Sequence, residues 1–352
     1  MTSASGPYTR PSLTQGANRL ITTVDYHTAG EPFRIVTAGA PDIPGRSVLD
    51  RREAAATGPA DEVRALLCNE PRGHADMYGC FLVPPDDPGA ALGTLFWHKD
   101  GFSTACGHGT IALGAYAVDA GLVAAPADGS VDVVIDVPSG RVTAVVSVAG
   151  GRVRSVTFVN VPSYVTARAV AVQTTRGPVE VDLSYGGATY ASARAADLGL
   201  AVKPAHLTDL IAIGREIRDA VNAAGAARHP VDSRLDGCYG TIWYDDLEST
   251  SDGVHQRNCT IFADGEVDRS PCGSGTSARL ALLHADGVLR PDGVLRHDSI
   301  IGTTFLGRVV SAVSVHDRPA VVTSVEGSAY RTGTHTFTLD PDDGLGAGFQ
   351  LR

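Results

Sequence analysis

Two cysteines stand in matching glycine-rich segments, and such thiols could do acid–base chemistry. Cys106 begins the segment Cys-Gly-His-Gly-Thr, and Cys272 begins the segment Cys-Gly-Ser-Gly-Thr, 166 residues further along the chain. At this offset the glycines that close the two segments, Gly121 and Gly287, also coincide. Two copies are too few for a solenoid, so the repeat predicts two similar domains that each present one thiol.

Each cysteine is expected at the start of a buried helix. Ser270 and Pro271 end the extended run before Cys272, and Ser274 or Thr276 is expected to cap the helix that follows. Apolar helix formers then continue to a glycine in the C′ position. Free N–H groups at a helix start attract anions and lower the pKa of a thiol, so both cysteines are expected to ionise readily.

Two such thiols could invert the Cα centre of an amino acid. A thiolate on one face removes the Cα proton, and a neutral thiol on the opposite face returns one. N–H groups of the helix ends hold the substrate carboxylate, and the glycines allow close approach of the backbone. The two thiols would titrate as a pair. This chemistry requires no metal, pyridoxal phosphate or nicotinamide, so no cofactor is expected.

Length, composition and charge fit a soluble enzyme with a small-molecule substrate. The 352 residues are 43% hydrophobic, enough for two ordinary cores. A net charge of −10 argues against nucleic-acid or anionic-membrane partners. No apolar run approaches the ~20 residues of a membrane span. Residues 1–19 are predicted to be a flexible leader rather than a signal peptide, which indicates a cytoplasmic protein. The six cysteines are expected to be reduced, and no metal site is expected because CxxC and HExxH spacings are lacking.

The pattern of the elements that position the thiols predicts an α+β fold. A hairpin, a polar-faced helix or helix pair at 47–67 and a β-meander at 131–159 are expected before Pro162, where the first domain ends. The second half has helical spacing over 207–224. Its expected strands include 179–183, 238–244, 259–262, 300–304, 308–315, 320–326 and 328–339. The strands should be mostly antiparallel, with one buried helix in each half.

Five motifs together make the chain resemble the proline racemase family, which includes 4-hydroxyproline epimerases and trans-3-hydroxy-L-proline dehydratases. The resemblance extends from Val24 to Arg352. Its motifs are His27-Thr28-Ala29-Gly30-Glu31-Pro32-Phe33-Arg34, Arg72-Gly73-His74-Ala75-Asp76-Met77-Tyr78-Gly79, Cys106-Gly107-His108-Gly109, Tyr185-Gly186-Gly187 and Asp268-Arg269-Ser270-Pro271-Cys272-Gly273-Ser274-Gly275.

The resemblance implies a diaminopimelate-epimerase-like fold of two pseudo-symmetric domains with the substrate between them. The first domain would span 20–162 and be completed by a returning strand within 337–352, and the second would span 163–336. By position, Cys106 and Cys272 would be the acid–base pair. The substrate-contacting positions would be Gly107, His108, Asp268, Gly273 and Ser274.

Other readings stay open. The sequence at 101–106 and at 239–242 is similar to that of the dehydratase branch of the family, which typically has Thr at the position of Cys272. The second thiol favours inversion of proline or hydroxyproline, with trans-3-hydroxy-L-proline dehydration as the alternative. A Cys/His hydrolase using His108 or His74 and a non-catalytic amino-acid-binding protein are further alternatives. The sequence does not decide which ring the protein prefers as substrate or whether the protein forms a homodimer. It also does not decide the roles of His27, His74, Glu31 and Arg34.

Overall fold

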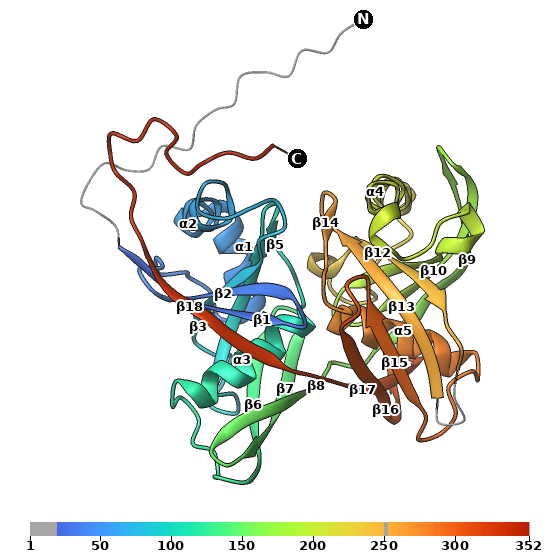
Figure 1. The fold of residues 1–352 in the computed structure, drawn as a ribbon, viewed down its shortest axis with the longest axis horizontal. Helices are drawn as coiled ribbons and strands as arrows, with labels where there is room; N and C mark the ends of the chain where they lie inside the picture. Colours follow the sequence, from blue (N-terminus) through green and yellow to red (C-terminus); the bar gives the residue numbers. More distant parts are fainter. Residues whose placement is uncertain (1–19, 250–252, 352) are drawn as a thin grey trace, which may run out of the picture.

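The computed structural model describes residues 20–249 and 253–351, which form two halves that lie side by side (Figure 1). Strands outnumber helices in both halves, and the described strands form one continuous network of hydrogen-bonded neighbours. This arrangement confirms the α+β fold class. The predicted leader, residues 1–19, lies outside the described residues. No helix in the described part of the chain is long and apolar enough to cross a membrane.

The first half wraps its strands around helix α3. Antiparallel pairs join β1 to β2, β3 to β4, and β6 to β7 to β8, whereas β2–β3 and β4–β6 are parallel. The helix or helix pair predicted at 47–67 is observed as two helices, α1 and α2, which lie outside this core. The elements are β1 (Ile21–Thr28), β2 (Glu31–Ala38), α1 (Val48–Thr57), α2 (Pro59–Cys68), β3 (Gly79–Val83), β4 (Leu92–His98), β5 (Gly101–Phe102), α3 (Gly107–Asp119), β6 (Gly129–Val137), β7 (Gly140–Ala149) and β8 (Arg152–Val159).

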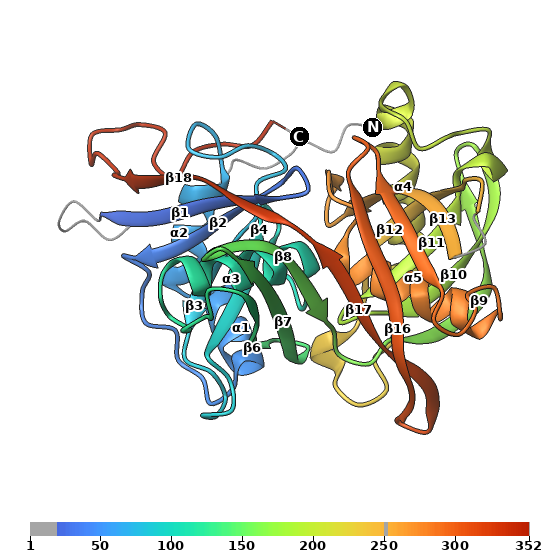
Figure 2. The same cartoon turned by 60° about the horizontal axis from the view of Figure 1, so that its bottom comes forward.

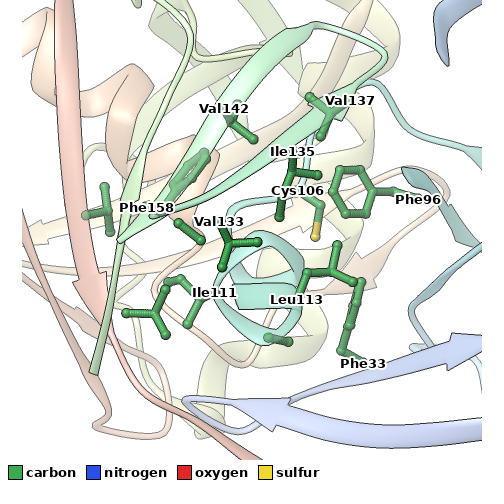
Figure 3. Packing of buried hydrophobic residues seen from close by; sticks show 14 of the residues in the cluster. Phe33, Phe96, Cys106, Ile111, Leu113, Val133, Ile135, Val137, Val142 and Phe158 are labelled. Carbon is green, nitrogen blue, oxygen red and sulfur yellow. The ribbon is translucent and has the colours of Figure 1, made fainter. Parts of the chain in front are cut away.

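Helix α3 is held by an apolar core on the concave side of the β6–β8 meander (Figure 3). Ile111 and Leu113 are fully buried, and the helix packs against β6, β7 and β8. Burial of each such side chain stabilises the fold by about 1.5–3 kcal/mol. Cys106 lies at the end of this helix, so the core fixes the position of its sulfur.

The second half repeats the plan around helix α5. This helix packs against β9, β10, β16 and β17, and α4 covers β12 and β13. The elements are β9 (Tyr164–Thr174), β10 (Gly177–Tyr185), β11 (Thr189–Arg194), 3-10 turns at Ala195–Leu198, Pro204–His206 and Ser233–Leu235, α4 (Leu207–Ala223), β12 (Cys238–Asp246), β13 (Gly253–Phe262), β14 (Glu266–Val267), α5 (Gly273–Ala285), β15 (Val294–Ser299), β16 (Thr304–Val315) and β17 (Arg318–Gly327).

Two strand pairings join the halves. β17 pairs with β8, and β18 (Ala329–Phe337) then crosses into the first half and pairs antiparallel with β1 (Figure 2). The expected return of the last strand to the first domain therefore occurs, but its predicted position within 337–352 is wrong. That segment instead turns at 340–346 and ends in a single β-bridge between Phe349 and Glu70. The division of the chain at 162 stays a prediction.

One other predicted strand is wrong. Residues 300–303 form the turn between β15 and β16, where Gly302 has a φ of 82°, and Thr304 already begins β16. A positive φ ends a strand at little cost only where the residue is glycine. The apolar Ile300 and Ile301 that favoured a strand therefore lie at a bend, and Ile301 is 52% exposed.

Candidate active site

The two buried helices α3 and α5 meet end to end at their N-termini. A Cβ built on Gly273 would lie 2.7 Å from the Cα of Gly107, so only glycine allows the two helix ends to approach this closely. Cys106 is the N-cap of α3, and Cys272 is the N-cap of α5. The prediction that Ser274 or Thr276 would cap the second helix is therefore wrong, because the helix already begins at Gly273. The closing glycines, Gly121 and Gly287, both have positive φ, as predicted.

The Cys106 sulfur is bound by the first turn of its own helix. Its backbone is extended, with φ −156°, and Sγ accepts a hydrogen bond of 3.2 Å from the N–H of Gly109. The Thr110 hydroxyl donates to the Cys106 carbonyl at 2.8 Å. The neighbouring His108 carbonyl accepts from Thr28 at the end of β1, at 2.9 Å. These bonds fix the thiol at a free helix end.

Cys272 is held by a different turn, with a left-handed backbone at φ 59°. The Asp268 carboxylate accepts from the N–H of Ser270 at 2.8 Å and from its hydroxyl at 2.7 Å. The Ser270 oxygen then accepts from the N–H of Cys272 at 3.1 Å. Left-handed backbone costs a non-glycine residue free energy, and such strain is common where a side chain must be aimed at a functional site.

Both thiols are buried, and this burial reverses the expected direction of their pKa values. Cys106 is 5% exposed and Cys272 is 6% exposed. Burial raises the pKa of the Cys106 thiol well above its usual range, and the Gly109 N–H only partly offsets it. Burial, followed by the nearby Asp268, raises the pKa of Cys272. The expectation of readily ionised thiols is wrong here, because desolvation outweighs the helix ends.

His108 and Asp268 lie between the two sulfur-bearing turns. His108 Nδ1 is 3.5 Å from Cys106 Sγ and 4.0 Å from an Asp268 carboxylate oxygen. Burial lowers the pKa of His108 to about 3, so the imidazole is neutral near pH 7. Burial raises the pKa of Asp268 to about 6, against the hydrogen bonds from Ser270. The His108 side chain beside Cys106 is therefore uncharged, whereas Asp268 ionises just below neutral pH.

The structure brings together all seven residues singled out from the sequence. Gly107 and Gly273 form the contact of the helix ends, and the Ser274 hydroxyl lies 2.7 Å from the hydroxyl of Tyr190. Neutral and ionisable groups thus surround two buried sulfurs and the N–H groups of two helices. Such a site can exchange a proton with a carbon acid and hold its carboxylate.

Three tyrosines beside the thiols were missed from the sequence. The Tyr190 hydroxyl lies 4.0 Å from Cys272 Sγ. The hydroxyl oxygens of Tyr78 and Tyr239 are hydrogen-bonded at 3.3 Å. The Tyr78 ring meets His108 edge to face, with 4.9 Å between centroids. Each tyrosine belongs to a different segment of the chain, so no local pattern could have gathered them. A weak signal was available, since Tyr78 lies within one family motif.

Glu31 and Arg269 join the two halves across the site. The buried Glu31 carboxylate accepts from the Arg269 N–H at 2.8 Å and pairs with its guanidinium at 2.9 Å. Burial raises the pKa of Glu31 well above its usual range, although Arg269 acts in the opposite direction. Arg269 also donates to the Asp76 carbonyl at 3.1 Å. These contacts anchor the Asp268–Cys272 turn to the first half.

The other polar residues left undecided by the sequence have local structural contacts. Arg34 pairs with Asp25 at 2.9 Å beside β1. His27 Nδ1 accepts from the N–H of Gly30 in the hairpin turn at 3.2 Å. His74 Nδ1 accepts from the N–H of Asp76 at 3.2 Å. The remaining cysteines, Cys68, Cys80, Cys238 and Cys259, are free and buried, as expected of core residues.

Among the described residues, one cluster has ligand atoms close enough for a metal ion. His98, Asp100 and Glu266 each offer an atom within 4.8 Å of the others. The N–H of Asp100 already donates to His98 Nδ1 at 3.2 Å, and a Glu266 oxygen lies 3.1 Å from the same nitrogen. Burial lowers the pKa of His98 to about 3 and raises that of Glu266 well above its usual range. Both carboxylate oxygens of Glu266 are buried without a hydrogen-bond partner among the described residues.

Comparisons with known proteins agree with this geometry. The family model described as proline racemase matches residues 23–350. The chain is 41% identical over 334 residues to a trans-3-hydroxy-L-proline dehydratase of Bacillus cereus, covering 95% of this chain and 99% of that protein. It is 43% identical over 339 residues to a 3-hydroxyproline 2-epimerase of Burkholderia multivorans, with the same coverage.

A solved structure shares the fold over nearly the whole chain. It is a hydroxyproline epimerase from Agrobacterium vitis with bound trans-4-hydroxy-L-proline. The TM-score is 0.87 at 30% identity, and the match covers 95% of this chain and 96% of that one. The diaminopimelate-epimerase-like fold expected from the sequence is thereby confirmed.

Proposed function

Because the chain belongs to the proline racemase family, we propose that it is a cofactor-independent epimerase that inverts Cα of proline or hydroxyproline. Cys106 and Cys272 form the acid–base pair. One thiolate removes the Cα proton, and the other thiol delivers a proton to the opposite face. The observation that carries this proposal is the placement of both thiols as N-caps of two helices whose ends meet.

The substrate carboxylate would bind where the helix ends meet. Gly107, His108, Gly273 and Ser274 lie in the first turns, where backbone N–H groups lack partners within the helix. Positive charge at a helix N-terminus stabilises an anion, and here two termini act on the same group. Asp268 would accept a hydrogen bond from the substrate amine. No metal or organic cofactor takes part in the proposed reaction.

The electrostatics of the site favour one thiolate and one thiol rather than two thiolates. Beyond burial, the negative charges of Asp268 and ionised Cys272 raise the pKa of Cys106. Ionising both thiols in a buried site would place three negative charges close together. A pair that holds a single proton has the charge state that inversion requires.

Dehydration of trans-3-hydroxy-L-proline is the second candidate, because relatives with that name are 39–44% identical to this chain. It would use Cys106 as the base and expel the 3-hydroxyl from the resulting carbanion. Cys272 favours inversion, since a second thiol returns a proton to Cα before elimination. A 3-hydroxyproline 2-epimerase is found at similar identity. A cytoplasmic location and a homodimer stay predictions.

The test is product analysis with three substrates. The purified protein is given proline, 4-hydroxyproline or trans-3-hydroxy-L-proline, and products are separated on a chiral column. The proposal expects the Cα epimer of at least one substrate, without added cofactor. An unsaturated product from 3-hydroxyproline, with no epimer from any substrate, would establish the dehydratase instead. Substrate binding without any turnover would indicate a binding protein.

A further inference from the structure

Three tyrosine hydroxyls form a wall beside the two thiols. Tyr78 precedes β3, Tyr190 lies in β11, and Tyr239 lies in β12. Tyr239 connects the other two, because its hydroxyl is 3.3 Å from that of Tyr78 and its ring meets Tyr190 edge to face with centroids 5.9 Å apart. Phe262 stacks on the Tyr239 ring at 5.5 Å. The wall is therefore an ordered aromatic surface that carries polar groups.

Each end of this wall touches one thiol. The Tyr190 hydroxyl lies 4.0 Å from Cys272 Sγ. At the other end, the hydroxyl of Tyr78 lowers the pKa of the Cys106 thiol by hydrogen bonding, against the larger effect of burial. A substrate Cα between the sulfurs, with its carboxylate on the helix ends, therefore has its ring beside this wall.

One residue of the wall, Tyr239, also faces open space. A pocket of about 260 Å³ between the halves is lined by Ser103 and Tyr239, together with residues such as Thr104, Ala188 and Gly237. Ser103 Oγ hydrogen-bonds the Tyr78 hydroxyl, so the same hydroxyl cluster reaches both the pocket and the neighbourhood of Cys106. Tyr78 is only 2% exposed, whereas Tyr239 is partly exposed.

We propose that the hydroxyls of Tyr78, Ser103 and Tyr239 form a subsite that binds the ring hydroxyl of a hydroxylated proline. This inference rests on the proposed function and names its substrate class. A phenol can donate one hydrogen bond and accept others. The 3.3 Å contact between the two phenols is longer than the usual 2.7–2.8 Å, so Tyr239 has hydrogen-bonding capacity for a ligand oxygen. In a site that bound only unsubstituted proline, phenylalanine side chains could pack against the proline ring equally well.

The polar wall discriminates between substrates because an unsubstituted ring leaves the hydroxyl groups of the wall without hydrogen-bond partners. A hydroxylated ring replaces the water lost by the tyrosine hydroxyls, whereas an unsubstituted ring leaves polar groups buried against methylene carbons. A site built to bind a substrate hydroxyl rejects the analogue that lacks it far more strongly than an apolar pocket rejects an added methylene. The preference should therefore be for 3- or 4-hydroxyproline over proline.

The closing experiment compares Tyr239→Phe and Ser103→Ala with the unmodified protein on proline, 3-hydroxyproline and 4-hydroxyproline. We expect kcat/KM for at least one hydroxyproline to fall ~10- to 100-fold more than that for proline. Where proline is not turned over, its competitive inhibition constant takes the place of kcat/KM. Tyr164→Phe is the matched control, because Tyr164 is buried and its hydroxyl has no hydrogen-bond partner among the described residues.

Equal losses on all rings would overturn the subsite, since they would mean that the wall only supports the fold or the thiols. A larger loss on proline than on the hydroxylated rings would overturn it as well. Failure of the proposed function is a separate outcome, because it would appear in the unmodified protein as absence of Cα inversion with every ring.

Discussion

The two thiol-bearing helix ends share a sequence pattern but differ in local geometry. Cys106 has an extended backbone, and its sulfur accepts directly from the Gly109 N–H at 3.2 Å. Cys272 has a left-handed backbone that the Asp268–Ser270 turn holds in place. After burial, the strongest influence on the pKa of Cys106 is this N–H, which lowers it, whereas for Cys272 it is Asp268, which raises it. The duplicated motif thus holds its two thiols in different local surroundings.

The two sulfurs therefore have different immediate partners. A helix N–H donates to Cys106, whereas Cys272 lies beside the Asp268 carboxylate. In the proposed mechanism, Cys106 supplies the base that both inversion and dehydration need, and Cys272 supplies the acid that only inversion needs.

The largest effect is expected from removing either thiol. Cys106→Ser and Cys272→Ser should each lower kcat for inversion by about 10²–10⁴-fold, because a hydroxyl is a poor acid and base at neutral pH. Circular dichroism should show an unchanged fold. Cys259→Ser is the control, since that buried cysteine lies in β13. Near-native turnover by either active-site variant would end the two-thiol account.

The second-largest effect distinguishes the two thiols by the reaction that each variant retains. Cys272→Thr should remove inversion but keep trans-3-hydroxy-L-proline dehydration, because elimination needs only the base Cys106 and a leaving hydroxide. The matched variant Cys106→Thr should lose both reactions. Liquid chromatography of the products would record the epimer and the unsaturated compound together. If Cys106→Thr dehydrated as well as Cys272→Thr, the assigned asymmetry would be reversed or absent.

A smaller effect concerns pH and Asp268. Its raised pKa of about 6 means that the carboxylate is present above pH 6 and is lost as the pH falls through that value. We expect kcat/KM to decline below pH 6 as the substrate amine loses this acceptor. Asp268→Asn should be slower throughout and lack this acidic limb. The exposed Asp87→Asn should keep it; a limb that persisted in Asp268→Asn would assign it to another group.

The smallest expected effect is a difference in thiol reactivity. Iodoacetamide should alkylate the two cysteines at different rates, because thiolate is the reactive form and the two sulfurs have different partners. Peptide mass spectrometry at several times would give both rates. A planar pyrrole carboxylate, which imitates the carbanion-like transition state, should protect both cysteines. Equal labelling rates for Cys106 and Cys272 would contradict the asymmetry of their surroundings.

The sequence predicted the parts of the site that depend on local pattern. The duplicated Cys-Gly segments revealed both helix starts, and the closing glycines revealed both helix ends. A strand was expected over 328–339, and β18 lies there, but the returning strand was placed beyond it. Strand pairing depends on which partner edge is free, and the sequence of a single segment does not encode that choice.

Two features of the site could not be read from the sequence because the folded halves create them jointly. The tyrosine wall gathers Tyr78, Tyr190 and Tyr239 from segments that are more than 45 residues apart. The direction of the thiol pKa shifts depends on burial, which results from closing one half against the other. Helix termini alone favour thiolates, and the sequence shows only those termini.

The central claim, two thiols acting on opposite faces of Cα, is tested most directly by following the reaction in D₂O. The L-substrate is incubated with the enzyme, and proton NMR of the separated epimers is recorded at low conversion. In the two-thiol mechanism the D-epimer carries solvent deuterium at Cα, while the recovered L-substrate keeps its protium. Deuterium in the recovered L-substrate as early as in the D-epimer would show that one group serves both faces and would contradict the account.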